Sequence, residues 1–441
     1  MTLIHRVVAV ASLGLFAACP PCPVPAPPGC ATDGTGSIVV NSTGLPAGVV
    51  GTIHLTGSTA QTVTSTQTLS VGSGAWSVTA DRATAADRFV RTVYLPTVTP
   101  ASFCLAPSGS QVVTVTWAPV ATSNKLWATN ANATGQFLGF RSASLASSAT
   151  VTADIISRGG FGADIAFDRD GNVWVPGGTT ADASLQRFPA SAFASSAAVE
   201  PDVKISLTGS ACLPLVAGLA FDAVGNLYVS SPCRDAVLRV DAASLTATGS
   251  VTPSLSIAIA DPAGIAFDRA GNLWAASRMD ERVWRYDASQ LSGGSVAAPA
   301  FKLGAFATSV PMDTSRLAPS WIAFDARGDL WANDFGGNKF FRMGAASLRA
   351  TGSSDEQPQV RITIGVTALL EGFAFDGEGG LWSAGSAGKI FRLAPSQLDV
   401  SSGAGMPTVP ETILTSSDIG SAANLAFYPA PTGLPLFHAL P

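Results

Sequence analysis

The sequence predicts an all-β protein: a six-bladed β-propeller closed by its own C-terminal strand and preceded by a small β-sandwich. Three observations lead to this prediction. Short runs in the first part of the chain alternate apolar and polar residues between turn residues, as strands buried on one face do. A strand-turn-strand unit then recurs at intervals of about 50 residues, the spacing of propeller blades. The two ends of that array supply complementary halves of one more unit.

The composition is typical of an exported β protein. The chain has 441 residues, of which 12% are charged, against about 25% in average soluble domains. Its net charge is −5 and it has no run of Lys or Arg, so we expect no nucleic-acid partner. The 9 Trp and 22 Phe residues provide large apolar side chains for a folded core, which excludes a disordered chain.

The N-terminus has the features of an export signal over residues 1–18. The uncharged stretch from Val7 to Ala18 is too short to span a membrane but suits a signal peptide. The run Phe16-Ala17-Ala18-Cys19 resembles a bacterial lipobox, which implies cleavage before Cys19 and lipid attachment to it. We therefore expect a lipid-anchored protein of the bacterial cell envelope, at the outer membrane or cell surface. A secreted protein with a disulfide-bonded Cys19 is the alternative.

A Pro-rich stem and a small β-sandwich are predicted next. Residues 19–34 favour extended polyproline geometry and suit a semi-rigid spacer. Residues 35–119 contain short alternating strands separated by turn clusters such as Gly44-Leu45-Pro46-Ala47-Gly48. This region resembles the Ig-like or transthyretin-like modules of bacterial surface proteins. Cys30 and Cys104 are one candidate disulfide pair, but the sequence leaves the pairing of Cys22, Cys30 and Cys104 open.

The repeats occupy residues 124–429, and residues 430–441 form a tail. Each copy reads Ala-Phe-Asp, two variable residues, Gly, and a second strand with an aromatic residue; the Gly supplies the positive φ of a tight turn. The array opens with a second strand, Lys125–Thr129, and closes with a first strand, Asn424–Tyr428. We therefore expect Leu126 and Phe427 to be neighbours in a closed ring. The complete copies begin at Ala166, Ala220, Ala266, Ala323 and Ala374.

An Asp on the first strand and an Arg on the third strand recur together. Asp268 and Arg285 are one such pair, and four other copies have both residues. In the closing unit Tyr428 replaces the Asp and Gly139 replaces the Arg. This joint loss leads to the hypothesis that the two residues form an ion pair within each blade, with a scaffold role.

The repeated line resembles NHL-repeat and gluconolactonase-like six-bladed propellers, and also streptogramin-lyase-type propellers. The resemblance covers most of Lys125–Tyr428 and implies the propeller fold. Streptogramin-lyase chemistry is expected to need a histidine, and the three histidines, His5, His54 and His438, lie outside the repeats. Gluconolactonase-like enzymes hold a divalent metal such as Ca²⁺ with Glu, Asn and Asp. The resemblance therefore implies, as one alternative, a metal-dependent hydrolase or lactonase with the ligands Glu371, Asp334, Asn130 and Asn424.

Residues that differ between the copies are better candidates for a site than those that recur. Trp321 stands where other copies have Gly218, Gly264 and Gly372, which makes it the preferred ligand contact. The other candidates in neighbouring loops are Arg278, Asp280, Arg234 and Phe335. A disulfide between Cys212 and Cys233 is predicted beside them.

The predicted function is a platform for binding a protein or a glycan. The repeats contain no His-based triad, Ser elbow or phosphate loop, which argues against an enzyme without excluding one. On this interpretation we expect a monomer without a cofactor, attached to the membrane by its lipid. The metal-dependent hydrolase and a structural spacer in an envelope assembly are the alternatives.

Overall fold

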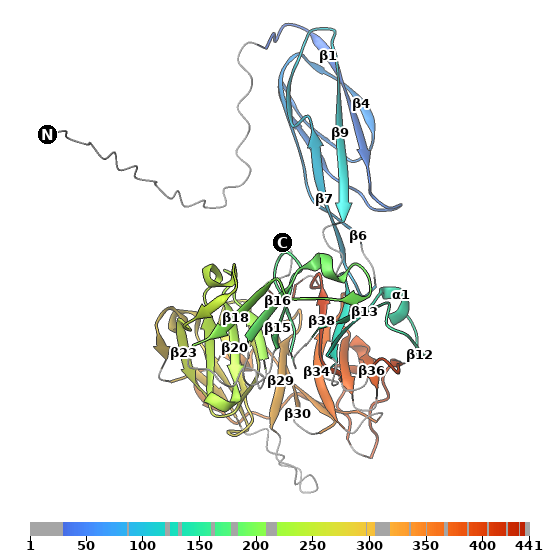
Figure 1. Cartoon of the computed structure of the whole chain (residues 1–441). Coiled ribbons are helices and arrows are strands. Elements are labelled where there is room, and N and C mark those ends of the chain that lie inside the picture. Colours follow the sequence, from blue (N-terminus) through green and yellow to red (C-terminus); the bar gives the residue numbers. More distant parts are fainter. Residues whose placement is uncertain are drawn as a thin grey trace, which may run out of the picture. The chain divides into compact units, whose positions relative to one another are not determined.

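Strands form almost all of the regular structure of the chain (Figure 1). The computed structural model divides into two units, Met1–Ala83 with Tyr94–Ala118, and Thr84–Val93 with Pro119–Pro441. None of the described helices has the length and hydrophobicity of a membrane span. The structure describes residues 30–85, 88–119, 124–130, 135–159, 164–177, 184–208, 218–296, 298–304, 318–334, 337–349, 351–365, 369–385, 388–403, 405–419, 422–431 and 433–436.

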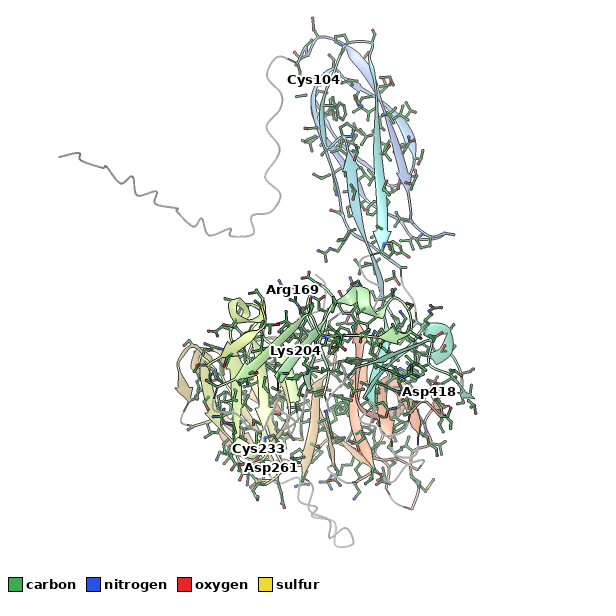
Figure 2. All side chains as sticks on the ribbon, in the orientation of Figure 1. Cys104, Arg169, Lys204, Cys233, Asp261 and Asp418 are labelled. Atoms are coloured by element: carbon green, nitrogen blue, oxygen red, sulfur yellow. A yellow bond between two sulfur atoms is a disulfide. The ribbon has the colours of Figure 1, made fainter. Side chains whose placement is uncertain are left out.

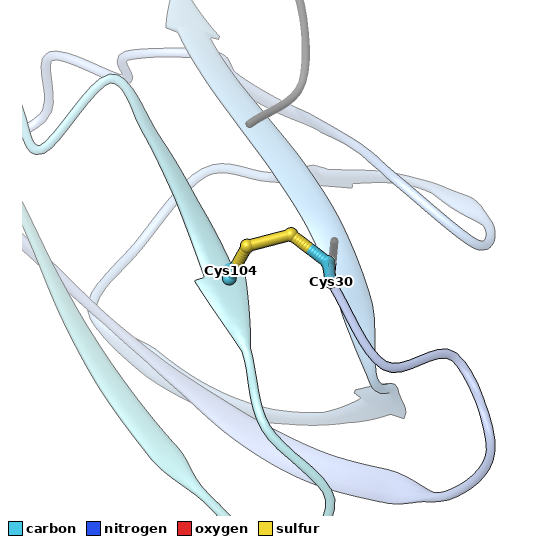
Figure 3. Close-up of a disulfide and its surroundings, with 2 residues drawn as sticks. All are labelled: Cys30 and Cys104. Carbon is cyan, nitrogen blue, oxygen red and sulfur yellow. A yellow bond between two sulfur atoms is a disulfide. The ribbon is translucent and has the colours of Figure 1, made fainter. Parts of the chain in front are cut away.

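The first unit is a sandwich of two sheets around one apolar core. Its two tryptophans are buried, and their indole N–H groups donate to protein oxygens: Trp76 to the carbonyl of Gly72 and Trp117 to Ser42 Oγ, both at 3.0 Å. A disulfide joins Cys30 and Cys104, whose Cα atoms are 5.5 Å apart (Figure 3). One sheet has the order β4 (Gln67–Gly72), β1 (Thr35–Thr43), β9 (Ser110–Pro119), β7 (Thr92–Thr99) and β6 (Ala83–Ala85), and the other β3 (Ala60–Val63), β2 (Ile53–Thr56), β5 (Gly74–Ala80) and β8 (Ser102–Leu105).

The second unit is a propeller, in which the described residues form six sheets that we number blades 1 to 6. Each blade has four antiparallel strands, written here from the axis outward. Blades 1 to 3 are β14 (Ala166–Phe167), β15 (Val173–Gly177), β16 (Ser184–Phe188), β18 (Val203–Leu207); β19 (Gly218–Phe221), β20 (Leu227–Ser231), β21 (Ala236–Val240), β23 (Leu255–Ala258); and β24 (Pro262–Phe267), β25 (Leu273–Ser277), β26 (Arg282–Tyr286), β28 (Phe301–Leu303). Blades 4 to 6 are β29 (Pro319–Phe324), β30 (Leu330–Asp334), β31 (Lys339–Met343), β33 (Val360–Thr363); β34 (Leu370–Phe375), β35 (Leu381–Gly385), β36 (Lys389–Leu393), β37 (Thr412–Thr415); and β38 (Ala422–Tyr428), β10 (Lys125–Asn130), β11 (Gln136–Phe140), β13 (Ile155–Arg158).

The last strand closes the ring by pairing with the first. β38 runs antiparallel to β10, with Leu126 opposite Phe427 and Ala128 opposite Leu425. The sequence-based prediction that Leu126 and Phe427 are neighbours is therefore confirmed. Both residues are buried in the core that blade 6 shares with blade 5, so closure also buries apolar surface.

Aromatic side chains pack successive blades together. An aromatic residue on the second strand of one blade contacts the Phe on the first strand of the next, as Trp274 does with Phe324 at a centroid distance of 5.8 Å. Trp331 contacts Phe375 in the same edge-to-face way at 6.0 Å. This repeated contact explains why each repeat has a Phe and an aromatic residue at fixed positions.

A second repeated segment covers the outer edges of the blades. After its third strand, each blade makes a short helical turn, and five of the six turns contain one buried Leu or Phe, such as Leu245 or Phe193. In most blades the chain then adds a short strand that pairs in parallel with the outermost strand of the preceding blade. This pairing covers backbone N–H and C=O groups at the edge of that blade. The turns are α1 (Ser142–Leu145), η1 (Ala190–Phe193), η4 (Ala242–Leu245), η5 (Ala288–Ser292), η6 (Ser347–Arg349) and η7 (Pro395–Gln397), and the strands are β12 (Ala149–Thr150), β17 (Ala197–Ala198), β22 (Gly249–Val251), β27 (Ser295–Val296) and β32 (Gly352–Ser354).

The recurring Asp organises its own hairpin turn and does not bind the recurring Arg in most blades. In blade 3, Asp268 accepts N–H groups from Ala270 and Asn272 and the indole N–H of Trp274 at 2.9 Å. Arg285 instead donates to Asp287 at 2.8 Å, and its guanidinium lies 5.7 Å from the centre of the Trp274 ring. The predicted ion pair is therefore wrong for this blade, because the turn residues satisfy the Asp.

The same correction holds in other blades, with one exception. Arg187 pairs with Asp202 at 2.9 Å, and Arg239 pairs with Asp241 at 2.9 Å. In blade 5 the predicted pair exists: Arg392 donates to Asp376 at 2.6 Å, and both side chains are buried.

The exception has a steric cause. In blade 5, Gly380 occupies the turn position that Asn272 occupies in blade 3, four residues after the recurring Asp. A Cβ atom at position 380 would lie 2.4 Å from Nη2 of Arg392. The Arg side chain thus occupies the space of the missing turn residue and reaches Asp376.

Residues 84–93 group with the propeller by their contacts. Phe89 is buried, and its ring lies edge-on to Trp382 of blade 5 at 5.5 Å. Arg88 donates to Glu378 at 3.0 Å and to Glu411 at 3.3 Å, and Arg392 contacts the same two carboxylates. The alternating pattern of residues 35–119 did not predict that Arg88 and Phe89 pack in this way.

We predict energetic coupling between Asp376 and Arg392 but little between Asp268 and Arg285. Urea unfolding of single and double Ala variants should give a coupling free energy of about 1–3 kcal/mol for the buried pair. The blade 3 pair should give a clearly smaller coupling free energy, because its two residues share the Trp274 ring as a neighbour but do not contact each other. Equal coupling in the two blades would contradict this assignment.

Candidate binding face of the propeller

The innermost strands all begin at one end of the propeller, which we call the start face. At this face, one residue at or just before the start of each innermost strand, two positions before the Ala of the repeat, faces the axis. These six residues form a ring, and three of them are glycines. A Cβ atom on Gly218 would lie 2.7 Å from the carbonyl oxygen of Ala263, and one on Gly264 would lie 2.7 Å from that of Ser320. Adjacent inner strands are therefore too close there for a side chain. The ring consists of Asp164, Gly218, Gly264, Trp321, Gly372 and Asn424.

Asp164 joins three blades at this ring. Its carboxyl group accepts the backbone N–H groups of Ile165 at 2.8 Å and of Leu219, in the next blade, at 2.5 Å. It also accepts the side-chain N–H of Asn424 from blade 6. Burial raises the pKa of Asp164 to about 7, because desolvation of the carboxylate outweighs the two backbone hydrogen bonds that favour its charged form.

Trp321 lies in the lining of a cavity on the propeller axis, and its role as a ligand contact stays a prediction. Its backbone N–H donates to Asn333 Oδ1 at 2.7 Å, and Asn333 Nδ2 donates to the carbonyl of Glu371 at 2.8 Å. Blades 4 and 5 are thereby linked through one buried amide. The indole ring of Trp321 also packs against the core of blades 4 and 5. Trp321 therefore both lines the axial cavity and supports the cavity wall.

The four residues predicted as alternative metal ligands have different surroundings. Of the four, only Asn424 lines the axial cavity, and its amide donates to Asp164. Asn130 is buried and donates to Gln136 at 3.2 Å and to the carbonyl of Asp418 at 2.6 Å. Within the described part of the chain, no group of three or more His, Cys, Asp or Glu residues is placed to hold a metal ion. Glu371 is partly buried, which raises its pKa, and Asp334 is buried at the end of β30.

Charged loops of blades 2 and 3 form a second group at the start face, which we call the rim patch: Arg234, Asp235, Asp261 and Arg278–Glu281. Arg278 makes a bidentate pair with Asp261, at 3.0 and 2.6 Å. Asp235 accepts the backbone N–H of Asp261 at 2.8 Å. In Figure 2, Asp261 and Cys233 lie at one end of the blades and Arg169 lies at the other.

The backbone of the rim patch adopts an uncommon conformation. Asp235, Asp261 and Glu281 have φ values of 49°, 42° and 54°, in the left-handed region that side chains other than Gly seldom adopt. The described chain has four such residues, and three of them are here. Because this conformation is unfavourable, its concentration in one patch points to a functional surface held in shape by its hydrogen bonds.

The predicted contacts are distributed as follows. Arg278 and Asp280 lie in the rim patch with the exposed Arg234, whereas Trp321 lines the axial cavity. Cys233 is disulfide-bonded, but Cys212 lies outside the described residues, so their pairing stays a prediction. Phe335 also lies outside them.

Sequence reasoning missed Asp164 and Asp261. Asp164 occupies the same repeat position as Trp321, so the comparison between copies that singled out Trp321 could have found it. Asp261 lies just before β24, outside the repeated line, and its pairing with Arg278 depends on how two loops meet.

The solved structures described below are similar to this chain at low sequence identity and low TM-score. The chain matches no protein-family model and no curated protein. A solved streptogramin B lyase is 14% identical, with 57% of this chain and 72% of that chain covered and a TM-score of 0.38. The virginiamycin B lyase of Staphylococcus aureus is 14% identical, with 63% of this chain and 83% of that chain covered and a TM-score of 0.36. The Cps50 (Swd1) β-propeller domain of Myceliophteria thermophila is 12% identical over 54% and 66%, with a TM-score of 0.37. We derive no activity or ligand from these similarities.

We predict that Asp164 makes the stability of the propeller depend on pH. Its folded pKa of about 7 lies above the ordinary value of 3.8, so the folded state holds a proton that the unfolded state has released. Its contribution to stability is greatest below pH 3.8 and is lost as the pH rises through 7, by an amount on the order of a few kcal/mol.

Urea unfolding of wild type, Asp164→Asn and the exposed control Asp170→Asn between pH 4.5 and 8 tests this prediction. Asp164→Asn should flatten the decrease in stability with rising pH, whereas Asp170→Asn should keep it. The assignment is wrong if Asp164→Asn shows the wild-type slope.

Proposed function

We propose that this protein is exported, anchored to the bacterial cell envelope by a lipid on Cys19, and binds a partner protein at the start face of its propeller. The lipobox-like run that ends at Cys19 supports the anchor. The propeller supports the binding role, because it holds loops from several blades on one rigid face.

The rim patch is the observation that carries the binding proposal. Met279 has 72% of its surface exposed, and charged residues of both signs surround it. Arg and Met are enriched where proteins bind each other, and a preformed surface loses less entropy on binding. The bidentate pair between Arg278 and Asp261 and the left-handed backbone hold this patch in one shape. An exposed Met on a rigid, charged rim suits a protein partner better than a sugar.

The alternatives receive less support. A metal-dependent hydrolase needs its ligands around one ion, and of the four predicted ligands only Asn424 lines the axial cavity. A structural spacer would not need exposed, strained loops at one end of the propeller.

We predict that the start face contacts the partner protein and that the opposite face does not. A photo-crosslinking amino acid at Met279, in the full chain expressed in intact cells, should produce a specific adduct. Val224 is the matched control, because it is 75% exposed and lies in a hairpin turn of blade 2 at the opposite face. Adducts at both positions, or at neither, would contradict the proposal. An adduct that loses its added mass on glycosidase treatment would identify a glycan as the partner instead.

The anchor has a separate test. Cys19→Ser should abolish the incorporation of labelled fatty acid and release the protein from the membrane fraction, because the acyl chains provide the membrane affinity. Cys22→Ser is the matched control and should leave both unchanged. If the Cys19→Ser protein still incorporates labelled fatty acid, the assignment of Cys19 as the lipid-bearing residue is wrong.

A further inference from the structure

A ring of six alanines surrounds the axis of the propeller. Successive residues of a strand point in opposite directions, so the second residue after the ring position faces the axis as well. This residue is Ala in every blade, and each of the six is partly exposed, whereas its two neighbours along the strand are buried, as around Ala266 and Ala323. The channel wall is therefore made of methyl groups from Ala166, Ala220, Ala266, Ala323, Ala374 and Ala426.

The C-terminal segment crosses the far end of this channel. The chain leaves β38 in blade 6, and Pro431, Leu434, Pro435 and Leu436 line the axial cavity. On the opposite side of the ring, Arg269 of blade 3 donates to the carbonyls of Gly433 at 2.5 Å and of Ala326 at 2.6 Å. Pro431 and residues 433–436 thus form what we call the strap, held at its far side by one guanidinium.

The axial cavity between the ring and the strap has a volume of about 140 Å³ and is partly open to solvent. A water molecule needs two to four polar partners, which methyl groups do not supply. Dry apolar cavities of about 150 Å³ in other proteins bind benzene or xenon. The size and the lining of this cavity thus suit a small apolar molecule.

The side chains of Asp164 and Asn424 in the lining bond to each other, and the buried indole N–H of Trp321 has no hydrogen-bond partner among the described residues. The carboxyl oxygens of Asp164 accept three N–H groups, and the amide of Asn424 supplies one of them. Among the described lining residues, no other side chain carries a charge. An anionic ligand would therefore find no counter-charge, and a cation would have to displace the hydrogen bonds of Asp164.

We propose that the axial cavity binds one small, uncharged, apolar molecule, of the size of benzene or indole, between the alanine ring and the strap. This site is separate from the rim patch and does not depend on the proposed protein partner. The strap controls access to the cavity from its own end.

Binding of benzene and of indole to the purified full chain, measured by ligand-observed NMR titration, tests this proposal. Ala266→Leu and Ala323→Leu fill the cavity from two blades, and each should weaken binding by at least about tenfold. Ala243→Leu adds the same side chain at an exposed position of η4 and should leave binding within about twofold of wild type. Arg269→Ala should release the strap and speed the exchange of bound benzene.

A measurement on the wild-type chain locates the molecule without any variant. Iodobenzene soaked into crystals should give an anomalous peak between Ala266 and Ala323. The proposal is overturned if wild type shows no saturable binding, if both leucine variants bind as wild type does, or if the iodine lies elsewhere. If neither leucine variant folds, the iodine position decides.

Discussion

The pairing of the last strand with the first is the interaction on which the rest of the propeller depends. β38 completes blade 6 by bonding to β10, which lies almost three hundred residues earlier in the chain, with Leu126 opposite Phe427. Asn424 and Asp164 then join blade 6 to blade 1, and Asp164 joins blade 1 to Leu219 of blade 2. An open array would expose two sheet edges and separate these groups. Closure therefore creates the ring of residues at the start face as well as the fold.

The tryptophans of the second strands explain the pattern that first indicated an ion pair. In blade 3 the Trp274 ring receives Arg285 on its face and donates its N–H to Asp268, so both charged residues depend on the same ring. In blade 6, Lys125 lies over Trp127 at 5.5 Å instead, and Gly139 leaves room for it. The joint loss of Asp and Arg thus reflects a shared neighbour and not a direct contact.

Residues that recur in every blade form the scaffold, whereas residues that differ between blades form the surfaces suited to binding. The six alanines repeat without exception and form an even, apolar channel wall. The ring at the start face departs from this regularity at Asp164, Trp321 and Asn424, which respectively bridge blades, line the axis and close the seam. The rim patch departs from it most, with three left-handed residues in loops that the other blades do not share.

The strands, the repeats and the closure of the ring could be predicted from the amino-acid sequence alone, because periodicity and turn glycines are local properties that recur in every copy. The sequence also pointed to Trp321, since internal comparison needs no coordinates. Only the tertiary structure decided which polar groups meet. The pairing of Arg278 with Asp261 and the packing of Phe89 against Trp382 join segments whose sequences contain no mark of each other. Likewise Asp376 reaches Arg392 because Gly380 leaves space, and space is a property of the packed blade.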